Sequence, residues 1–395
     1  EHDFTIIDRA RLAEADPLFK PLAPDRIAQL NRVPNDPDLG SQWVHDNSGQ
    51  FIADGFFVGN GVQDADIDST EAWDITIGSR DVIVAVIDTG VDLDHPDLEA
   101  NIWRNPNEIP GNGIDDDNNG FVDDVTGWDF GENDNNPDDV NGHGTGAAGL
   151  IGAVGNNGIG RTGVAWEVSI LPLKIANRFG QLTFSAVIGS HDYLTMMIED
   201  FDHNIVASNN SYGAFTQAIY NEVLDEDDPD LGPLVAEGQA VQRFIQTGAA
   251  FVASAGNDFN DNDNTGLTNY PASYDLPGII SVAATAPDDT LAVYSNFGAQ
   301  SVDVAAPGIA PGSLAPGGGF QPFGGTSAAG PVVAGTIALL KTVKPDASGE
   351  ELLNVLISSS DQLPALQNIV VSGGRINAAR ALAIIGLDGP VVRRV

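Results

Sequence analysis

Short apolar runs recur along the chain, and most of them end at Gly, Asn, Asp or Ser and are followed by a helical pattern. Such runs are typical of strands buried on both faces of a parallel sheet, because a half-exposed strand alternates apolar with polar residues. The clearest run is DVIVAVID, residues 81–88. Further strands are expected in the runs that begin at Ser169, Asn204, Ala249, Gly278 and Ser301.

Helical patterns lie between these runs. They follow His143 and Ser327 and occupy much of 180–201 and 233–247. Strands that alternate with helices predict an α/β fold with a central, mostly parallel sheet, here of about seven strands, and helices on both faces. We expect one such domain over residues 33–385, between a polar N-terminal extension at 1–32 and a C-terminal tail at 386–395.

The charge of the chain excludes several classes of partner. Of its 395 residues, 56 are Asp or Glu and 17 are Lys or Arg, so the net charge is −39, and 42% are hydrophobic, too many for a disordered acidic tail. This charge repels nucleic acids and anionic membranes. No apolar stretch reaches the ~20 residues that a membrane span needs. The absence of Cys excludes disulfides, thiolate metal sites and cysteine nucleophiles.

Three polar residues stand where an α/β sheet collects catalytic groups, beyond the carboxyl ends of its strands or at the start of a helix. Asp88 ends an apolar strand, His143 opens a helix in NGHGTG, and Ser327 opens another in GGTSAAGP. A nucleophilic hydroxyl needs a base to take its proton, and that base needs an acid to orient it. Taken singly, each residue is more simply a turn former, a loop residue or a helix N-cap. Together they predict a nucleophilic site.

The sequence around these residues resembles the subtilisin-like serine proteases. AVIDTGVDLDHPDL, NGHGTGAAG and GGTSAAGP resemble the three catalytic blocks of that family, in its chain order of Asp, His and Ser. A fourth block, ASAGN, resembles the oxyanion segment, and the resemblance extends from about Val33 to about Leu382. GTSA also resembles the acid-active sedolisin branch, against which His143 and Asn257 argue.

The resemblance implies a three-layer subtilisin-like fold and a role for each block. Ser327 would attack the peptide carbonyl, His143 would act as general base and then acid, and Asp88 would orient His143. Asn257 would donate its amide to the oxyanion. The implied walls and base of the first specificity pocket are Ser211, Tyr212, Gly213, Ser254, Ala255, Gly256 and Asn269. The chain departs from the family pattern at Gly146, Ala328 and Val332.

An acidic, Gly- and Asn-rich block covers residues 115–139, within a stretch that lacks Lys and Arg from 105 to 160. Oxygen ligands at alternate positions and a Gly at the turn resemble the first half of an EF-hand calcium loop. Thr126 stands where the bidentate Glu would close that loop, so Asp123 or Asp124 would have to close it. The expected ligands are Asp115, Asp117, Asn119, Phe121, Asp123 and Asp124. The alternative is a solvated turn.

The resemblance implies two further calcium sites. One is similar to the medium-affinity loop of the thermitase branch, with Asp129, Glu132, Asp134, Asn136 and Asp138 as ligands. The other is the tight site of the family, with Asp36, Asp97 and Asn157 and with carbonyls near Val154, Ile159 and Arg161. We therefore expect two to three calcium ions that stabilise the fold.

The sequence thus predicts a secreted, calcium-stabilised serine endopeptidase of broad specificity that acts on proteins and peptides. We expect a monomer, inhibited by its own pro-segment before maturation, with residues 1–32 as a remnant of that segment or as an N-terminal arm. Two alternatives remain open: a catalytically silent binding protein of the same fold, and a calcium-dependent structural module. Hydrolysis of a protein substrate distinguishes the predicted endopeptidase from both alternatives.

Overall fold

The computed structural model describes residues 32–53, 56–215, 232–264 and 267–386. The extension at 1–32, except Arg32, the acidic run at 222–230 and the tail at 386–395, except Gly386, therefore lie outside the described residues. The chain divides into two units, Glu1–Asn31 and Arg32–Val395, and all of the described residues belong to the second.

The central strand of the sheet is β3 (Gly78–Asp88), and its sequence explains its position. Val82, Val84 and Val86 belong to the core on one face of the sheet, whereas Ile83, Ala85 and Ile87 belong to the core on the other. Because neighbouring side chains of a strand point to opposite faces, an uninterrupted apolar run is suited only to a strand covered on both sides. The parallel strands β5 (Glu167–Lys174) and β6 (Ile205–Asn210) flank it.

The sheet has nine strands, in the order β14-β15-β11-β10-β8-β6-β3-β5-β4. All neighbouring pairs are parallel except β14 and β15. About seven strands were expected, and three strands at the edges have only two residues each. The bounds are β4 (Trp128–Asp129), β5 (Glu167–Lys174), β6 (Ile205–Asn210), β8 (Ala250–Ser254), β10 (Ile279–Thr285), β11 (Val304–Pro307), β14 (Asp361–Gln362) and β15 (Gly374–Arg375).

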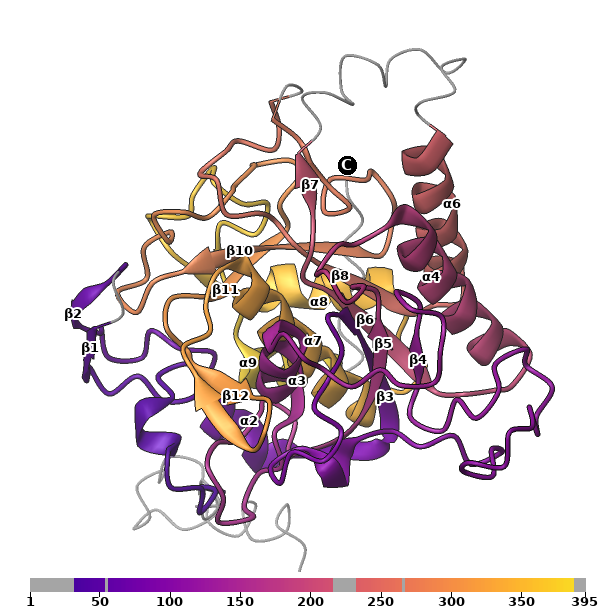
Figure 1. Ribbon diagram of the computed structural model, residues 1–395. Coiled ribbons are helices and arrows are strands. Elements are labelled where there is room, and N and C mark those ends of the chain that lie inside the picture. Colours follow the sequence, from indigo (N-terminus) through magenta and orange to yellow (C-terminus); the bar gives the residue numbers. More distant parts are fainter. Residues whose placement is uncertain (1–31, 54–55, 216–231, 265–266, 387–395) are drawn as a thin grey trace, which may run out of the picture. The chain divides into compact units, whose positions relative to one another are not determined.

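Helices cover both faces of this sheet, which confirms the expected three-layer α/β fold (Figure 1). One face packs against α3 (His143–Gly152), α7 (Thr326–Val343), α8 (Gly349–Ser359) and α9 (Ala378–Ile385), with α2 (Ser69–Ile75) beside α9. The other face packs against α4 (Phe184–Glu199) and α6 (Gly232–Gln246). Helix α7 is long and apolar enough to cross a membrane, but it is 83% buried as a core helix.

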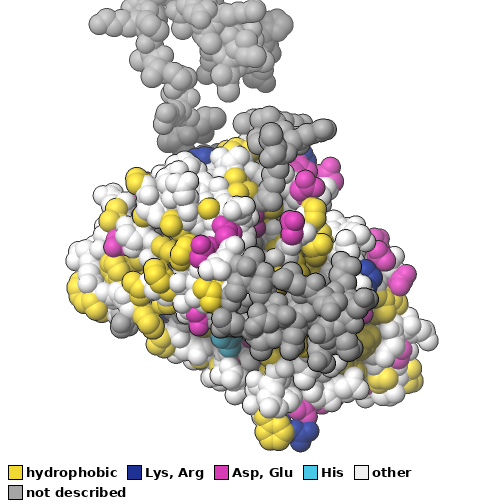
Figure 2. All heavy atoms as spheres, turned by 90° about the horizontal axis from the view of Figure 1, so that it is seen from above, with side chains coloured by type: hydrophobic (Ala, Val, Ile, Leu, Met, Phe, Trp, Pro, Cys, Tyr) yellow, Lys and Arg dark blue, Asp and Glu magenta, His cyan; other side chains and the backbone are white. Residues whose placement is uncertain are grey.

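Three two-stranded antiparallel pairs and two 3₁₀ turns complete the described part of the chain. The pairs are β1 (Phe51–Ala53) with β2 (Val58–Asn60), β7 (Ala214–Phe215) with β9 (Asn269–Tyr270), and β12 (Ser313–Ala315) with β13 (Gly319–Gln321). The turns are η1 (Leu39–Ser41) and η2 (Glu99–Asn101). On the face seen from above, acidic side chains outnumber basic ones (Figure 2).

A buried cation joins the early and late parts of this unit. Arg375, only 2% exposed, pairs with Asp289 and Asp361 and donates to the carbonyl of Asp64 at 3.0 Å. Next to it, Asn377 donates to Asp68. A buried guanidinium needs such acceptors, since desolvation without them costs several kcal/mol.

Candidate active site

Asp88 and His143 form a hydrogen-bonded pair at the carboxyl end of β3. The two carboxylate oxygens of Asp88 lie 2.8 and 3.0 Å from Nδ1 of His143, and Asp88 is 5% exposed. The Asp88 charge raises the pKa of His143 above its ordinary value, against the effect of burial. The pair leaves the other ring nitrogen, Nε2, as the atom that can exchange a proton with a substrate or nucleophile.

Asp139, which the sequence analysis missed, holds the loop that carries His143. One of its oxygens accepts from Thr89 Oγ1 and from the N–H groups of Asn141 and Gly142, and the other accepts from both the N–H and the hydroxyl of Thr145. Five hydrogen bonds to one carboxylate, 4% exposed, fix the start of α3 relative to the end of β3. No capping signal in the sequence marks Asp139, because the N-cap of α3 is Gly142, three positions later.

Ser327 is the second residue of α7, and its environment favours a reactive hydroxyl. Backbone N–H groups in the first turn of a helix have no intrahelical acceptor, and the helix dipole places partial positive charge there. The preceding Gly325 has φ 91°, a left-handed conformation that glycine adopts without strain. This turn lets Ser327 stand at the mouth of a pocket instead of in the core that receives the rest of α7.

Asn257 lies next to Ser327 with its amide oriented by Thr326. Its Oδ1 accepts from the N–H of Thr326 at 2.8 Å and from the Thr326 hydroxyl at 3.1 Å. Because the oxygen is held in this way, the NH₂ group is directed away from Thr326. Asn257 and Ser327 line the same pocket, so an oxyanion formed at Ser327 would lie near two donors, the Asn257 amide and the Ser327 N–H.

Six of the seven expected specificity residues line this pocket, which has a volume of about 150 Å³. Asn269 at its base donates to the carbonyls of Ser254 and Ala255, and a Cβ on Gly213 would lie 2.7 Å from the Asn269 side chain. The exception is Ala255, whose fully buried side chain belongs to a core cluster with Ala283 and Val302. Asp258 is an additional lining residue.

The departure from the family pattern at Gly146 has a steric reason. A Cβ at Gly146 would lie 2.6 Å from the ring of Phe323, which occupies that space. The same ring packs edge-on against His143, with 5.3 Å between centroids. Gly146 therefore accommodates Phe323 without disturbing the contact between Asp88 and His143.

The expected tight calcium site brings its carboxylates together. Asp36 accepts from the N–H groups of 156–158, and Asp97 accepts from Asn157 Nδ2 at 2.8 Å and from the N–H of Arg161 at 3.0 Å. Asp36 is 4% exposed and Asp97 is fully buried. Burial raises the pKa of Asp97, and the charge of Asp36 adds to this rise. In the described residues neither carboxylate has a salt-bridge partner, so the donor set fits a bound cation.

A carboxylate upstream of the EF-hand-like loop lies close to two of the expected ligands. Oxygens of Glu108, Asp115 and Asp117 all lie within 4.8 Å of one another, and Glu108 was not among the expected ligands. Asp123 instead accepts from the N–H groups of 112 and 113. Asp124 accepts from Tyr193, Asn105 and Asn119. The prediction that Asp123 or Asp124 closes the loop stays a prediction, and Glu108 is a further candidate for the third carboxylate.

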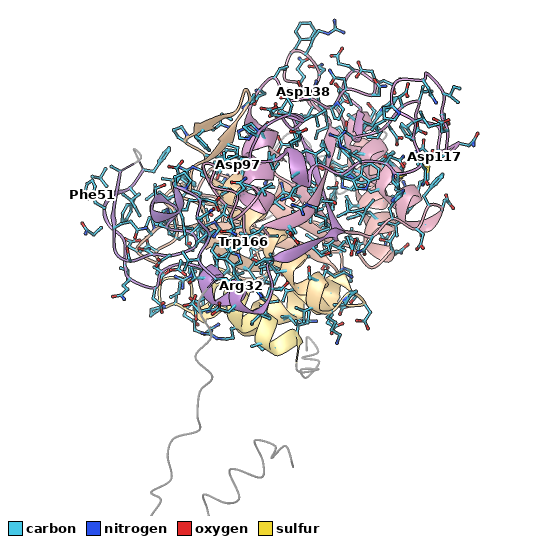
Figure 3. The ribbon with its side chains drawn as sticks, turned by 90° about the horizontal axis from the view of Figure 1, so that it is seen from below. Arg32, Phe51, Asp97, Asp117, Asp138 and Trp166 are labelled. Carbon is cyan, nitrogen blue, oxygen red and sulfur yellow. The ribbon has the colours of Figure 1, made fainter. Side chains whose placement is uncertain are left out.

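Two of the expected ligands in the thermitase-like loop form ion pairs with basic side chains of the chain itself. Asp129, 1% exposed, forms a 2.9 Å ion pair with Lys174, and Glu132 pairs with Arg178. Asp134 accepts from the N–H of Asn136, and Asp138 accepts from the N–H of Leu93. The Lys174 ammonium supplies the positive charge that a metal ion would otherwise bring to Asp129. Figure 3 shows Asp117 at one edge of the molecule, well away from Asp97 and Asp138.

A parallel α/β sheet with a hydrogen-bonded Asp and His pair at a strand end and a serine at the start of a helix is the arrangement expected of an α/β serine protease. The Subtilase family model matches residues 79–373. The chain therefore belongs to the subtilase family, and it is a subtilisin-like serine protease by fold and descent.

Relatives at the sequence level include a bacterial and a parasite enzyme. The chain is 32% identical over 316 residues to Thermitase of Thermoactinomyces vulgaris, which covers 80% of this chain and 93% of the relative. It is 33% identical over 320 residues to Subtilisin-like protease 1 of Plasmodium falciparum, which covers 76% of this chain. The match spans only 43% of that longer relative.

Solved structures show the same architecture. A protease from Pseudoalteromonas arctica aligns with a TM-score of 0.65 and 26% identity over 90% of this chain and all of that one. A cold adapted subtilisin-like serine proteinase aligns with a TM-score of 0.54 and 27% identity over 76% of this chain and 88% of that one. The predicted fold and family are thereby confirmed.

Proposed function

We propose that the chain is a calcium-stabilised serine endopeptidase of broad specificity. Asp88, His143 and Ser327 would act as its triad and Asn257 as an oxyanion donor. The observation that carries the proposal is the 2.8 Å contact between buried Asp88 and Nδ1 of His143, at the end of the strand on which the family places this pair. Neutral His143 takes the proton of Ser327 as its oxygen attacks the peptide carbonyl, then returns it to the leaving amine. Water hydrolyses the resulting acyl-enzyme by the same proton transfers.

Labelling of Ser327 by phenylmethanesulfonyl fluoride tests the triad directly. We expect one added group per chain on the peptide that contains Ser327, measured by mass spectrometry. Because His143 must be neutral to act as base and Asp88 raises its pKa, the labelling rate should fall as the pH is lowered through a midpoint above about 6.5. Asp88→Asn should slow labelling and move the midpoint to lower pH. Labelling at another serine, or a rate independent of pH, would refute the assignment.

The oxyanion role of Asn257 is tested by Asn257→Asp, which keeps the oxygen that accepts from Thr326 but replaces the NH₂ donor by a charged oxygen. We expect kcat for peptide hydrolysis to fall about 10²- to 10³-fold or more, the lower range being the size known for the corresponding asparagine of subtilisin itself. The KM should change little, because the bond forms chiefly in the transition state. An unchanged kcat would remove Asn257 from the mechanism.

For calcium we propose two sites. The first has Asp36, Asp97 and Asn157 as side-chain ligands, with carbonyls of the 154–161 loop, and the second has Glu108, Asp115 and Asp117. Support comes from the clustering of these oxygens and from the burial that raises the pKa of both Asp97 and Glu108. Bound calcium would neutralise these carboxylates and join loops that are distant in sequence.

The two proposed calcium sites also lead us to propose that the protein is secreted, because extracellular calcium is abundant enough to fill oxygen-ligand sites of modest affinity. Maturation from an inhibited precursor and a monomeric state stay predictions.

A further inference from the structure

One buried side chain holds the backbone on both sides of Asn257, the candidate oxyanion donor. The side chain of Asn296 is fully buried, and its Oδ1 accepts from the N–H of Asp258 at 2.9 Å and from the N–H of Asn260 at 3.0 Å. Its Nδ2 donates to the carbonyl of Ala255 at 3.1 Å. Asn296 therefore connects the chain before Asn257 to the chain after it.

The carbonyl of Ala255 is shared by three asparagines, which together form an asparagine cage. It accepts from the side-chain amides of Asn262 at 2.9 Å, Asn269 at 3.0 Å and Asn296 at 3.1 Å, and none of the three residues is more than 3% exposed. Asn296 also donates to Oδ1 of Asn262 at 3.1 Å. A carbonyl oxygen has two lone pairs, so three donors saturate it and restrict rotation of this peptide group.

The turn at Gly256 brings this backbone against the asparagine cage. Gly256 has φ 111°, and a Cβ there would lie 2.4 Å from Nδ2 of Asn296. Its carbonyl accepts from the N–H of Asn296 at 2.8 Å, and its N–H donates to the hydroxyl of Thr326 at 3.2 Å. The peptide groups before Asn257 are thus held by the cage on one side and by the start of α7 on the other.

Backbone pairing keeps Asn296 in place independently of its side chain. The neighbouring Phe297 donates its N–H to the carbonyl of Asn260 at 3.0 Å, and its own carbonyl accepts from the N–H of Asn262 at 2.7 Å. Because these bonds are made by the main chain, a substitution at Asn296 removes the side-chain contacts around Asn257 and leaves the paired segments together.

We propose that Asn296 is a positioning residue for the reaction and that it acts through Asn257. An oxyanion donor is effective when it is held in advance where the negative charge develops, and Asn296 holds the backbone that carries this donor. Asn296 is itself fully buried and does not line the described pocket that contains Asn257 and Ser327, so it does not touch the substrate. The inference rests on the proposed endopeptidase function and goes beyond it.

A double-mutant cycle with a peptide p-nitroanilide in calcium buffer tests this role. We expect Asn296→Ala to lower kcat per folded chain by about tenfold to 10²-fold, the size expected when a catalytic group is displaced by up to ~1 Å. The KM should change little, because Asn269 keeps its bond to the Ala255 carbonyl at the base of the specificity pocket. In the Asn257→Ala background the same substitution should lower kcat by less than about twofold, since the donor that it positions is already absent. Equal losses in both backgrounds would overturn the inference.

Asn47→Ala is the matched control for the loss of a buried asparagine. Asn47, which is 1% exposed, donates to the carbonyls of Ala65 and Pro287 and accepts from the N–H of Gly49. Its removal should lower the melting temperature, as that of Asn296 does, but should leave kcat per folded chain unchanged. An equal fall of kcat in both variants would assign the effect to lost stability and would contradict a positioning role.

If Asn296→Ala does not fold, Asn296→Ser, which keeps a hydroxyl inside the asparagine cage, replaces it in the same cycle and is judged by the same comparison. An unchanged kcat in the folded variant, with an active parent, would overturn the role of Asn296 alone. A folded, calcium-loaded parent that does not hydrolyse the anilide would overturn the proposed function and this inference with it.

Discussion

Ser327→Ala is expected to lower kcat for cleavage of an unfolded protein substrate in calcium buffer by about 10⁶-fold, a magnitude known for the corresponding serine of subtilisin itself. The loss is this large because the hydroxyl is the atom that bonds to the substrate, and His143 and Asp88 have no nucleophile to activate without it. The residual rate would come from Asn257 and the backbone donors, which still polarise the carbonyl. The measurement is release of acid-soluble peptides by the parent and the variant side by side.

The control for this substitution is the melting temperature, which should be nearly unchanged because Ser327 is only half-buried and removal of its hydroxyl leaves no cavity in the core. Equal cleavage by both chains would assign the activity to another nucleophile. If neither chain cleaves the substrate while both are folded and calcium-loaded, the hypothesis of a catalytically silent binding protein replaces the proposed function. Gly146 would not explain such a result, since Phe323 fills the space beside it.

Removal of calcium by excess chelator is expected to lower the melting temperature by roughly 5 °C for each site occupied at about a thousand times its Kd. The physical reason is electrostatic. Glu108 is 6% exposed and Asp97 fully buried, and each lies near other carboxylates, so without a cation these groups repel or must take up protons. Scanning calorimetry with calcium and with chelator measures the difference.

Substitutions of the proposed ligands show how much each calcium site contributes to the change in melting temperature. Asp115→Asn with Glu108→Gln should remove the contribution of one site, and Asp36→Asn that of the other. Asp129→Asn is the control, because it breaks the ion pair with Lys174 and should lower the melting temperature equally with and without calcium. A melting temperature that does not respond to chelator in the parent chain would remove the calcium proposal entirely.

The sequence allowed the parallel sheet and the Asp88 and His143 pair to be predicted because local patterns encode both. Buried strands are apolar throughout, and the catalytic blocks are short segments with their own glycines. The two-residue edge strands β4, β14 and β15 could not be predicted, since their pairing depends on neighbours and not on their own side chains.

Two contacts in the calcium loops could not be predicted from the sequence for a related reason. Lys174 lies on β5, 45 positions after Asp129 in the sequence, and only the register of β4 against β5 places its ammonium beside that carboxylate. Glu108 was overlooked because an EF-hand is closed downstream, whereas this loop folds back on the segment that precedes it.

The link between Arg375 and Asp64 spans 311 positions, which bears on how the protein is made. The ribosome must synthesise almost the entire domain before Asp64 can bind Arg375. The edge of the sheet that contains Arg375 therefore forms only after the other strands have been synthesised. Contacts between residues so far apart in sequence slow folding. Where these contacts must also break before the chain unfolds, the unfolding rate is low and the native state lasts longer. For an enzyme that would meet copies of itself as potential substrates, slow opening limits the time during which its own backbone can be cut.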